Sequence, residues 1–308
     1  MIITQFRKYT PTNMVLLVVL GLVIFLIGFY HSHASFDPAS ASGLFISLGL
    51  ILIQAFYLNK VMNKYNFFGK PGFLVALLYL SFACFGNSLD ELSPILICNF
   101  IFIRMIDKLI EVYHREEAKA IMFDLGMLVG IGSLIYYPFA AMLLSVWVGL
   151  RLFRPFYWRE WIAPILGFLT VLFLVWVYYF WMDRVDEFIA FWPSEFQFSF
   201  EFIRAGFSDY LVWGAVVVIL ILFLNVLREN IFKRVVQIRK IVQLLSIMLL
   251  TSFLAYFLDQ RTEGSQFFLT LPPLSIYAAY YFHFASTRWF YEIVYLLILL
   301  TIVIFQFL

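Results

Sequence analysis

The sequence predicts an all-α membrane protein, a polytopic helical bundle of about eleven transmembrane helices with the N-terminus inside and the C-terminus outside. Of its 308 residues, 64% are hydrophobic and 13% are charged, and the mean hydropathy is +0.93. Soluble domains carry about 25% charged residues, so water could not solvate this chain. The apolar blocks are continuous rather than alternating, which favours helices over a barrel.

The predicted spans are apolar blocks that reach, or nearly reach, the length needed to cross a hydrocarbon core of ~30 Å. The shortest of them suit inner helices that a bundle shields from lipid, or a locally thinned bilayer. Residues 1–308 then form a single integral membrane domain. The blocks are 14–30, 43–58, 71–86, 92–110, 121–136, 139–153, 161–181, 210–227, 241–258, 267–284 and 289–308.

The basic residues set the predicted orientation, because Lys and Arg accumulate in the cytoplasmic loops of membrane proteins. With eleven spans and the N-terminus inside, eighteen of the 21 Lys and Arg fall on the inner side. The three on the outer side are Arg184, Arg204 and Arg261. A different number of spans would scramble this alternation. Acidic residues are common in the outer loops instead, and topology alone explains most of that bias.

The centre of the chain carries the sharpest local signals. A tight corner at 136–138 separates two short spans, and a basic corner at 151–159 precedes the next one. Gly126 and Gly130 have the small-residue spacing that lets membrane helices approach closely. Asp124 lies near the inner end of its span. A carboxylate within a span is costly, and we predict that Asp124 is a structural intramembrane ion paired with an inner basic residue.

Carboxylates in the first two outer loops are the candidate catalytic groups. Asp37 follows His31 and His33 in the first loop, and Asp90 and Glu91 lie together in the second. Such groups act as a general acid or base, or hold a divalent cation beside a phosphate. The alternatives are structural, because a His-x-His turn in a polar loop is commonly solvated, and acids before a helix are stabilised by its dipole.

Two further segments are expected to lie at the membrane surfaces. Residues 182–210 form an outer aromatic-rich interfacial loop, in which alternating rings from Phe196 to Phe202 lie at headgroup level. Residues 227–242 form an inner basic amphipathic segment with five Lys and Arg among apolar residues. This second segment is expected to contact anionic lipid headgroups.

Two stretches carry a resemblance to known families. They are Asp124-Leu-Gly-Met-Leu-Val-Gly-Ile-Gly-Ser-Leu-Ile-Tyr-Tyr-Pro138 and Arg154-Pro-Phe-Tyr-Trp-Arg-Glu-Trp-Ile-Ala-Pro-Ile-Leu-Gly-Phe168. Together they resemble an uncharacterised family of polytopic inner-membrane proteins from Bacteroidota, with similarity along most of the chain. That family implies no activity.

The same glycine-rich span, short turn and return span resemble, more loosely, the GT-C-type membrane glycosyltransferases. Those enzymes take a sugar from a polyprenyl-phosphate donor at the outer face of the membrane. Their catalytic acid lies in the first outer loop and further acids in the next. The resemblance therefore implies Asp37, Asp90 and Glu91 as the matching positions.

Three functions remain open at this point, and the sequence leaves undecided whether the protein is an enzyme. The first is a transferase acting on a polyprenyl-phosphate-linked glycan, with the outer carboxylates as acid, base or ligands of a divalent cation. In it, Arg184 or Arg261 binds the substrate phosphate bidentately. The second is a non-catalytic subunit or scaffold of an envelope assembly or secretion complex, and the third is a lipid or small-molecule transporter.

The expected location is the bacterial inner membrane, with multiple passes. The expected partners are membrane lipids, anionic headgroups at the inner face and, according to the function, a polyprenyl-phosphate lipid or other envelope proteins. Nucleic acid is not expected, because the basic residues are spread over helix ends rather than gathered in one patch.

Overall fold

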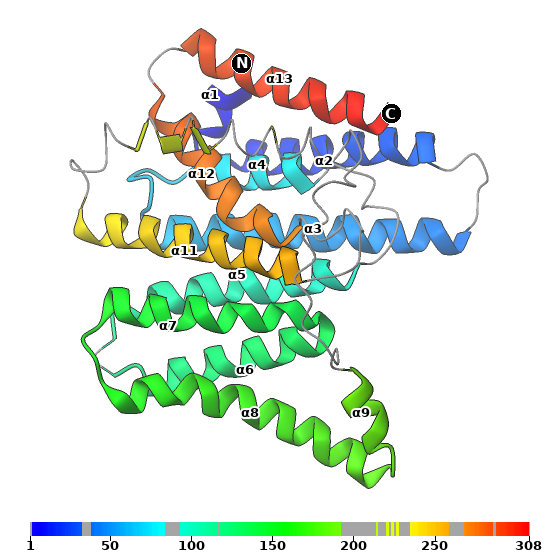
Figure 1. Ribbon diagram of the computed structural model, residues 1–308. Helices are drawn as coiled ribbons and strands as arrows, with labels where there is room; N and C mark the ends of the chain where they lie inside the picture. Colours follow the sequence, from blue (N-terminus) through cyan, green and yellow to red (C-terminus); the bar gives the residue numbers. More distant parts are fainter. Residues whose placement is uncertain are drawn as a thin grey trace. The chain divides into compact units, whose positions relative to one another are not determined.

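The computed structural model describes residues 2–32, 38–83, 93–115, 117–191, 235–258, 268–285 and 288–307, with scattered positions between 214 and 227. Every regular element over these residues is helical, and no strand occurs among them (Figure 1). The all-α fold class predicted from the sequence is therefore confirmed for the described part of the chain.

The described helices follow the predicted apolar blocks closely, apart from block 210–227, which lies largely outside the described residues. The helices are α1 (Ile2–Phe6), α2 (Pro11–Ser32), α3 (Pro38–Lys64), α4 (Leu74–Ala83), α5 (Pro94–Val112), α6 (Lys119–Ile135), the 3-10 helix η2 (Tyr137–Ala141), α7 (Met142–Phe153), α8 (Trp158–Trp181), α9 (Val185–Phe191), α11 (Val236–Leu258), α12 (Leu271–Phe284) and α13 (Arg288–Phe307).

Proline residues mark several helix starts. Pro11, Pro38 and Pro94 are the first residues of α2, α3 and α5, and Pro272 is the second residue of α12. Proline suits this first turn because the N–H that it lacks would have no partner within the helix. These positions explain why the helices begin where they do.

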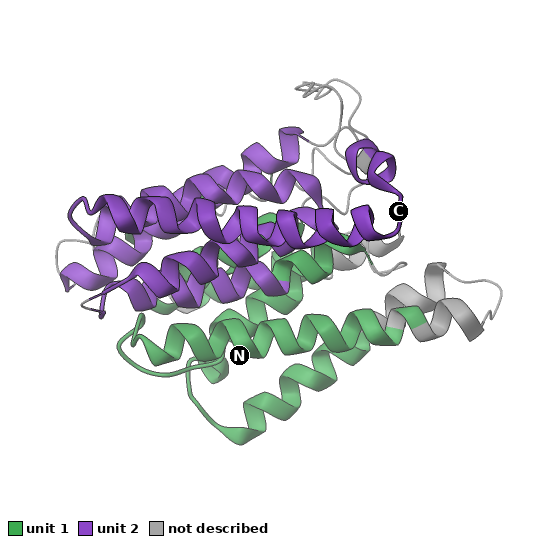
Figure 2. Ribbon diagram, turned by 90° about the horizontal axis from the view of Figure 1, so that it is seen from below, with its two compact units in different colours: residues 1–99, 202–234, 264–308 green, residues 100–201, 235–263 purple. Residues whose placement is uncertain are grey.

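The chain divides into two compact units, each built from separate stretches of sequence (Figure 2). Unit 1 comprises residues 1–99, 202–234 and 264–308, and unit 2 comprises residues 100–201 and 235–263. Helix α5 begins in unit 1 and continues into unit 2.

Three helices of the described residues are long and apolar enough to cross a membrane. They are the Phe45–Lys64 part of α3, the whole of α8 and the whole of α11. Shorter apolar helices occupy Pro11–Val23, Leu74–Ala83, Tyr137–Phe153 and Trp289–Thr301.

Helix α4 corresponds to the short apolar block 71–86. All ten of its residues, from Leu74 to Ala83, are buried. It packs against α3 and α12 within unit 1. A helix that is apolar on every side is typical of a position inside a bundle, where neighbouring helices rather than solvent or lipid surround it.

Helices α6 and α8 of unit 2 cross in close contact. A Cβ atom on Gly126 would collide with the Pro164 carbonyl oxygen, and one on Gly167 would collide with the Phe123 carbonyl oxygen. A Cβ on Gly130 would come within 2.9 Å of an α8 side chain. Gly126 and Gly130 are therefore packing positions, as the sequence analysis predicts.

The turns around this crossing also match their predicted places. Tyr136 has an extended backbone at the end of α6, and η2 begins at the next residue. The predicted corner at 136–138 is thus confirmed. After α8, the predicted outer segment 182–210 contains the short helix α9, and its remainder, 192–210, lies outside the described residues. In the predicted inner segment 227–242, α11 starts at Val236, and 228–234 are outside the described residues.

Candidate functional site

The candidate catalytic groups fall outside the part of the chain that the structure describes. This applies to Asp37, Asp90 and Glu91 and to the phosphate-binding candidate Arg261. Their roles stay predictions.

Arg184 is the predicted phosphate-binding residue that the structure does describe. It lies between α8 and α9, its side chain is 66% exposed, and its Nε is 3.8 Å from the Glu187 carboxylate. Asp124 belongs to the start of α6, close to the start of α8. Asp124 lies level with the Pro164 to Gly167 part of α8, well before that helix ends at Trp181. At 1.5 Å per residue, Arg184 and Asp124 lie roughly 25 Å apart along the bundle, so the fold does not bring them together.

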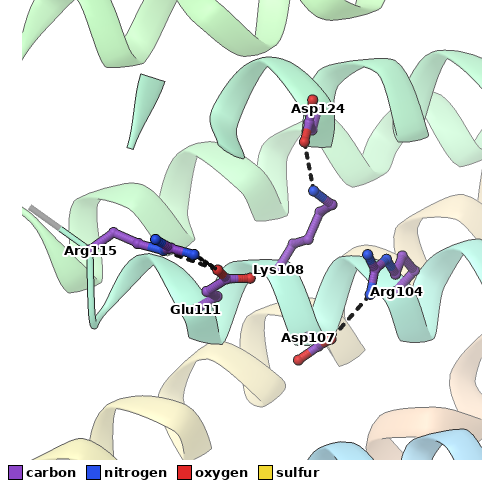
Figure 3. A network of polar contacts seen from close by, with 6 residues as sticks. All are labelled: Arg104, Asp107, Lys108, Glu111, Arg115 and Asp124. Atoms are coloured by element: carbon purple, nitrogen blue, oxygen red, sulfur yellow. Dashed lines mark hydrogen bonds and ion pairs between the residues drawn. The ribbon is translucent and has the colours of Figure 1, made fainter. Parts of the chain in front are cut away.

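Ion pairs gather at one end of unit 2, around the last turns of α5 and the start of α6 (Figure 3). Asp124 accepts a hydrogen bond from Lys108, and its side chain is half exposed, whereas the Asp107 side chain is buried. The pairs are Lys108 Nζ–Asp124 Oδ2 at 2.6 Å, Arg104 Nη1–Asp107 Oδ2 at 3.3 Å and Arg115 Nη2–Glu111 Oε1 at 2.7 Å. We call this end of unit 2 its charged end.

A buried carboxylate ties the helix connections of the charged end together. Glu160, in the first turn of α8, is 3% exposed and accepts a hydrogen bond from the Ala118 N–H at 3.1 Å. Its other oxygen lies 3.4 Å from Arg154 Nε, and Arg154 donates to the Arg115 carbonyl at 2.9 Å. One ion pair therefore links the α5–α6 connection, the end of α7 and the start of α8.

The start of α11 joins the same end through polar and aromatic contacts. Gln237 Nε2 lies 2.9 Å from His114 Nε2, and Lys240 Nζ lies 5.5 Å from the centre of the Tyr113 ring. A cation over an aromatic face is attracted by the ring quadrupole. These contacts connect α11 to the last residues of α5 and its exit.

Unit 1 holds a different polar cluster, made of neutral side chains from three of its helices. The Tyr79 hydroxyl donates to Gln54 Oε1 at 2.7 Å, and Gln54 Nε2 donates to the Leu96 carbonyl at 2.7 Å. Asn99 Nδ2 donates to the Phe268 carbonyl at 2.7 Å. All three side chains are fully buried. We call Gln54, Tyr79 and Asn99 the amide clasp, because they join α3, α4, α5 and the entry to α12.

The N-terminal helix is fastened to the rest of unit 1 by a second group of polar contacts. Glu292, which is buried near the start of α13, accepts hydrogen bonds from the Thr4 N–H at 3.1 Å and the Thr4 hydroxyl at 2.9 Å. Arg7 donates to the Phe282 carbonyl at the end of α12 and lies over the Tyr291 ring. A cation at this position satisfies helix C-terminal carbonyls and is favoured by the helix dipole.

Neither the amide clasp nor the contacts of Glu292 were predicted from the sequence. A signal for them was present, since Gln54 and Asn99 are isolated amides in long apolar runs. In a membrane helix such residues usually find partners on neighbouring helices. Which neighbours these would be depends on the packing.

Within the described ranges, no three His, Cys, Asp or Glu side chains lie close enough together to hold a metal ion. Comparisons with protein-family models, with curated proteins and with solved structures find no match to this chain.

Proposed function

We propose that this chain is a multi-pass protein of the bacterial inner membrane, with eleven spans, the N-terminus inside and the C-terminus outside. The charge distribution of unit 2 supports this orientation. Its described basic residues other than Arg184 gather at the charged end, whereas Asp183, Asp186 and Glu187 follow the far end of α8 together with Arg184. An inner leaflet faced by cations and an outer face bearing acids is the arrangement that membrane insertion favours.

Within that membrane, the role we propose is that of a non-catalytic subunit or scaffold of an envelope assembly. The observation that carries it is the use of the buried carboxylates. Asp107, Glu160 and Glu292 are the buried acids of the described residues, and each binds a cation, hydroxyl or N–H of this same chain. Carboxylates used in this way stabilise helix packing and are not available to a substrate.

The test is rescue of a deletion strain by variants of the outer-loop acids. Asp37→Asn, Asp90→Asn and Glu91→Gln should each restore the envelope phenotype as fully as the wild type, with protein abundance verified by immunoblot. Loss of rescue at normal abundance would refute the scaffold role.

A GT-C-like transferase acting on a polyprenyl-phosphate-linked glycan at the outer face is the second candidate. The observation that favours it is the exposure of Arg184, whose guanidinium has, among the described residues, a single ion pair with Glu187 at 3.8 Å and can reach a phosphate. A divalent cation held by the outer carboxylates would be its cofactor. In this role Arg184→Gln should abolish transfer of a radiolabelled sugar from a polyprenyl-phosphate donor to membrane acceptors, whereas Lys70→Gln should leave it intact.

A further inference from the structure

The length of α8 places the corner that precedes it at a membrane surface. Helix α8, from Trp158 to Trp181, is one of the described helices long and apolar enough to cross a membrane. At 1.5 Å per residue it is roughly 36 Å long, which exceeds the ~30 Å hydrocarbon core. The residues just before Trp158 therefore lie at the level of the lipid headgroups.

Three consecutive aromatic side chains in this corner are exposed. Phe156, Tyr157 and Trp158 are 66%, 55% and 61% exposed. Adjacent exposed rings are unfavourable in water, but rings at the headgroup level are enriched in membrane proteins because one part of the ring is apolar and the other polar. These rings would anchor the corner in the interfacial layer.

Two exposed arginine side chains flank the rings. Arg151 and Arg159 are both exposed, and across the described part of the chain no carboxylate pairs with either. The neighbouring acid, Glu160, is turned inward and used by Arg154 and the Ala118 N–H. The Glu160 charge is therefore compensated inside the protein and does not neutralise the exposed arginines.

The position of Arg159 also suits a phosphate. Its guanidinium carbon lies 5.5 Å from the centre of the Trp158 ring, so the cation and the ring form one surface. Guanidinium groups bind phosphate oxygens through two parallel hydrogen bonds and stack on rings, and they are more weakly hydrated than ammonium groups.

We infer that the corner 151–159 is a binding site for anionic phospholipid headgroups, in which Arg151 and Arg159 contact the headgroup phosphate and the exposed rings insert beside it. The inference rests on the proposed membrane role and specifies a lipid class and residues for it. Charge complementarity and continuity with the α8 span select a lipid as the occupant. Each basic residue near an anionic membrane surface adds about 1 kcal/mol of attraction, so the two arginines together should favour anionic over neutral lipid.

The experiment uses the full chain purified in a neutral detergent and given an equimolar mixture of phosphatidylglycerol and phosphatidylcholine, with retained lipids identified by native mass spectrometry. The wild type should retain phosphatidylglycerol preferentially. Arg151→Gln/Arg159→Gln should weaken that retention by roughly tenfold or more. Trp158→Ala, which keeps both cations, should give a smaller loss.

The control removes two exposed cations elsewhere, as Lys60→Gln/Lys70→Gln. It should retain phosphatidylglycerol as the wild type does. An equal loss in the control would mean that net charge alone attracts the lipid, and equal retention of the two lipids by the wild type would mean that the corner has another occupant. Either result overturns the inference. Neither would alter rescue by the outer-loop variants, so failure here is distinguishable from failure of the proposed function.

Discussion

The buried amides of the described residues all belong to unit 1, whereas the buried carboxylates are divided, with Glu292 in unit 1 and Asp107 and Glu160 in unit 2. Gln54 of the amide clasp lies midway along α3, and Glu160 lies in the first turn of its helix. A neutral amide costs little in an apolar interior once its hydrogen bonds are made, but an ion there costs several kcal/mol even when it is paired. Gln54 therefore lies at a depth where a neutral amide is tolerated, and Glu160 lies near a helix end, where an ion is better tolerated.

The two units also differ in the contacts that join their helices. Unit 1 joins helices through specific hydrogen bonds between amides, a hydroxyl and carbonyls. Unit 2 joins α6 and α8 by backbone contact at glycines and then ties the connections at its charged end with ions. Substitutions at these contacts should reduce stability to different extents, most at the glycine crossing and least at the Lys108–Asp124 pair.

The glycine crossing of unit 2 should be the most sensitive site. Gly126→Leu would place a side chain where the α8 backbone lies, so we expect a loss of more than about 4 kcal/mol and little folded protein. Thermal unfolding in detergent micelles measures this. Gly49→Leu, at a helical glycine whose Cβ would meet nothing within 4 Å, is the matched control and should fold normally. Normal folding of both variants would refute the close crossing.

The buried ion pair of the charged end should come next. Glu160→Ala leaves Arg154 and the Ala118 N–H without their carboxylate, and breaking a buried pair costs about 3 kcal/mol. Glu117→Ala removes a 79% exposed carboxylate on the α5–α6 connection and should change stability by less than about 0.5 kcal/mol. Equal effects in denaturant titrations would show that Glu160 has no special structural role.

The amide clasp of unit 1 should give a smaller effect. Gln54→Leu removes the acceptor of the Tyr79 hydroxyl and the donor to the Leu96 carbonyl, at a cost of about 1 to 2 kcal/mol. Tyr79→Phe alone should cost about 1 kcal/mol. The double variant should lose less than the sum, because the two residues share a hydrogen bond. Strict additivity in a double-mutant cycle would contradict that bond.

The ion pair between Lys108 and the half-exposed Asp124 should matter least. Lys108→Met breaks a short contact, but Asp124 remains in reach of water, so we expect a loss below about 1 kcal/mol. Raising the salt concentration should shrink the difference between wild type and variant. A loss that is large and insensitive to salt would mean that the pair is buried within a tighter structure than the one described.

Local sequence signals were enough to predict the longer described helices, although not the short helices α1 and α9. The apolar blocks, the corner at 136–138 and the glycine spacing all follow from rules that act over a few residues, and they reappear in α6, η2 and α8. The basic residue that pairs with Asp124 is Lys108, sixteen positions earlier. A pairing across helices of this kind depends on tertiary packing, which the sequence pattern does not specify.

Long-range contacts account for what was missed. Glu292 binds Thr4 across most of the length of the chain, and Asn99 reaches the carbonyl of Phe268. The sequence separation between the partners follows no helical period, because the packing of several helices brings them together. The outer-loop acids were predicted from composition and from a family resemblance, and their arrangement depends on loops outside the described residues.

The proposed orientation is tested most directly by determining on which side of the membrane each end of unit 2 lies. In a background with Cys84 and Cys98 replaced by Ala, Lys119→Cys marks the charged end and Asp186→Cys marks the opposite end. A membrane-impermeant maleimide applied to intact bacterial spheroplasts should label Asp186→Cys at once and Lys119→Cys only after permeabilisation. Labelling of Lys119→Cys in intact spheroplasts would contradict the proposed orientation.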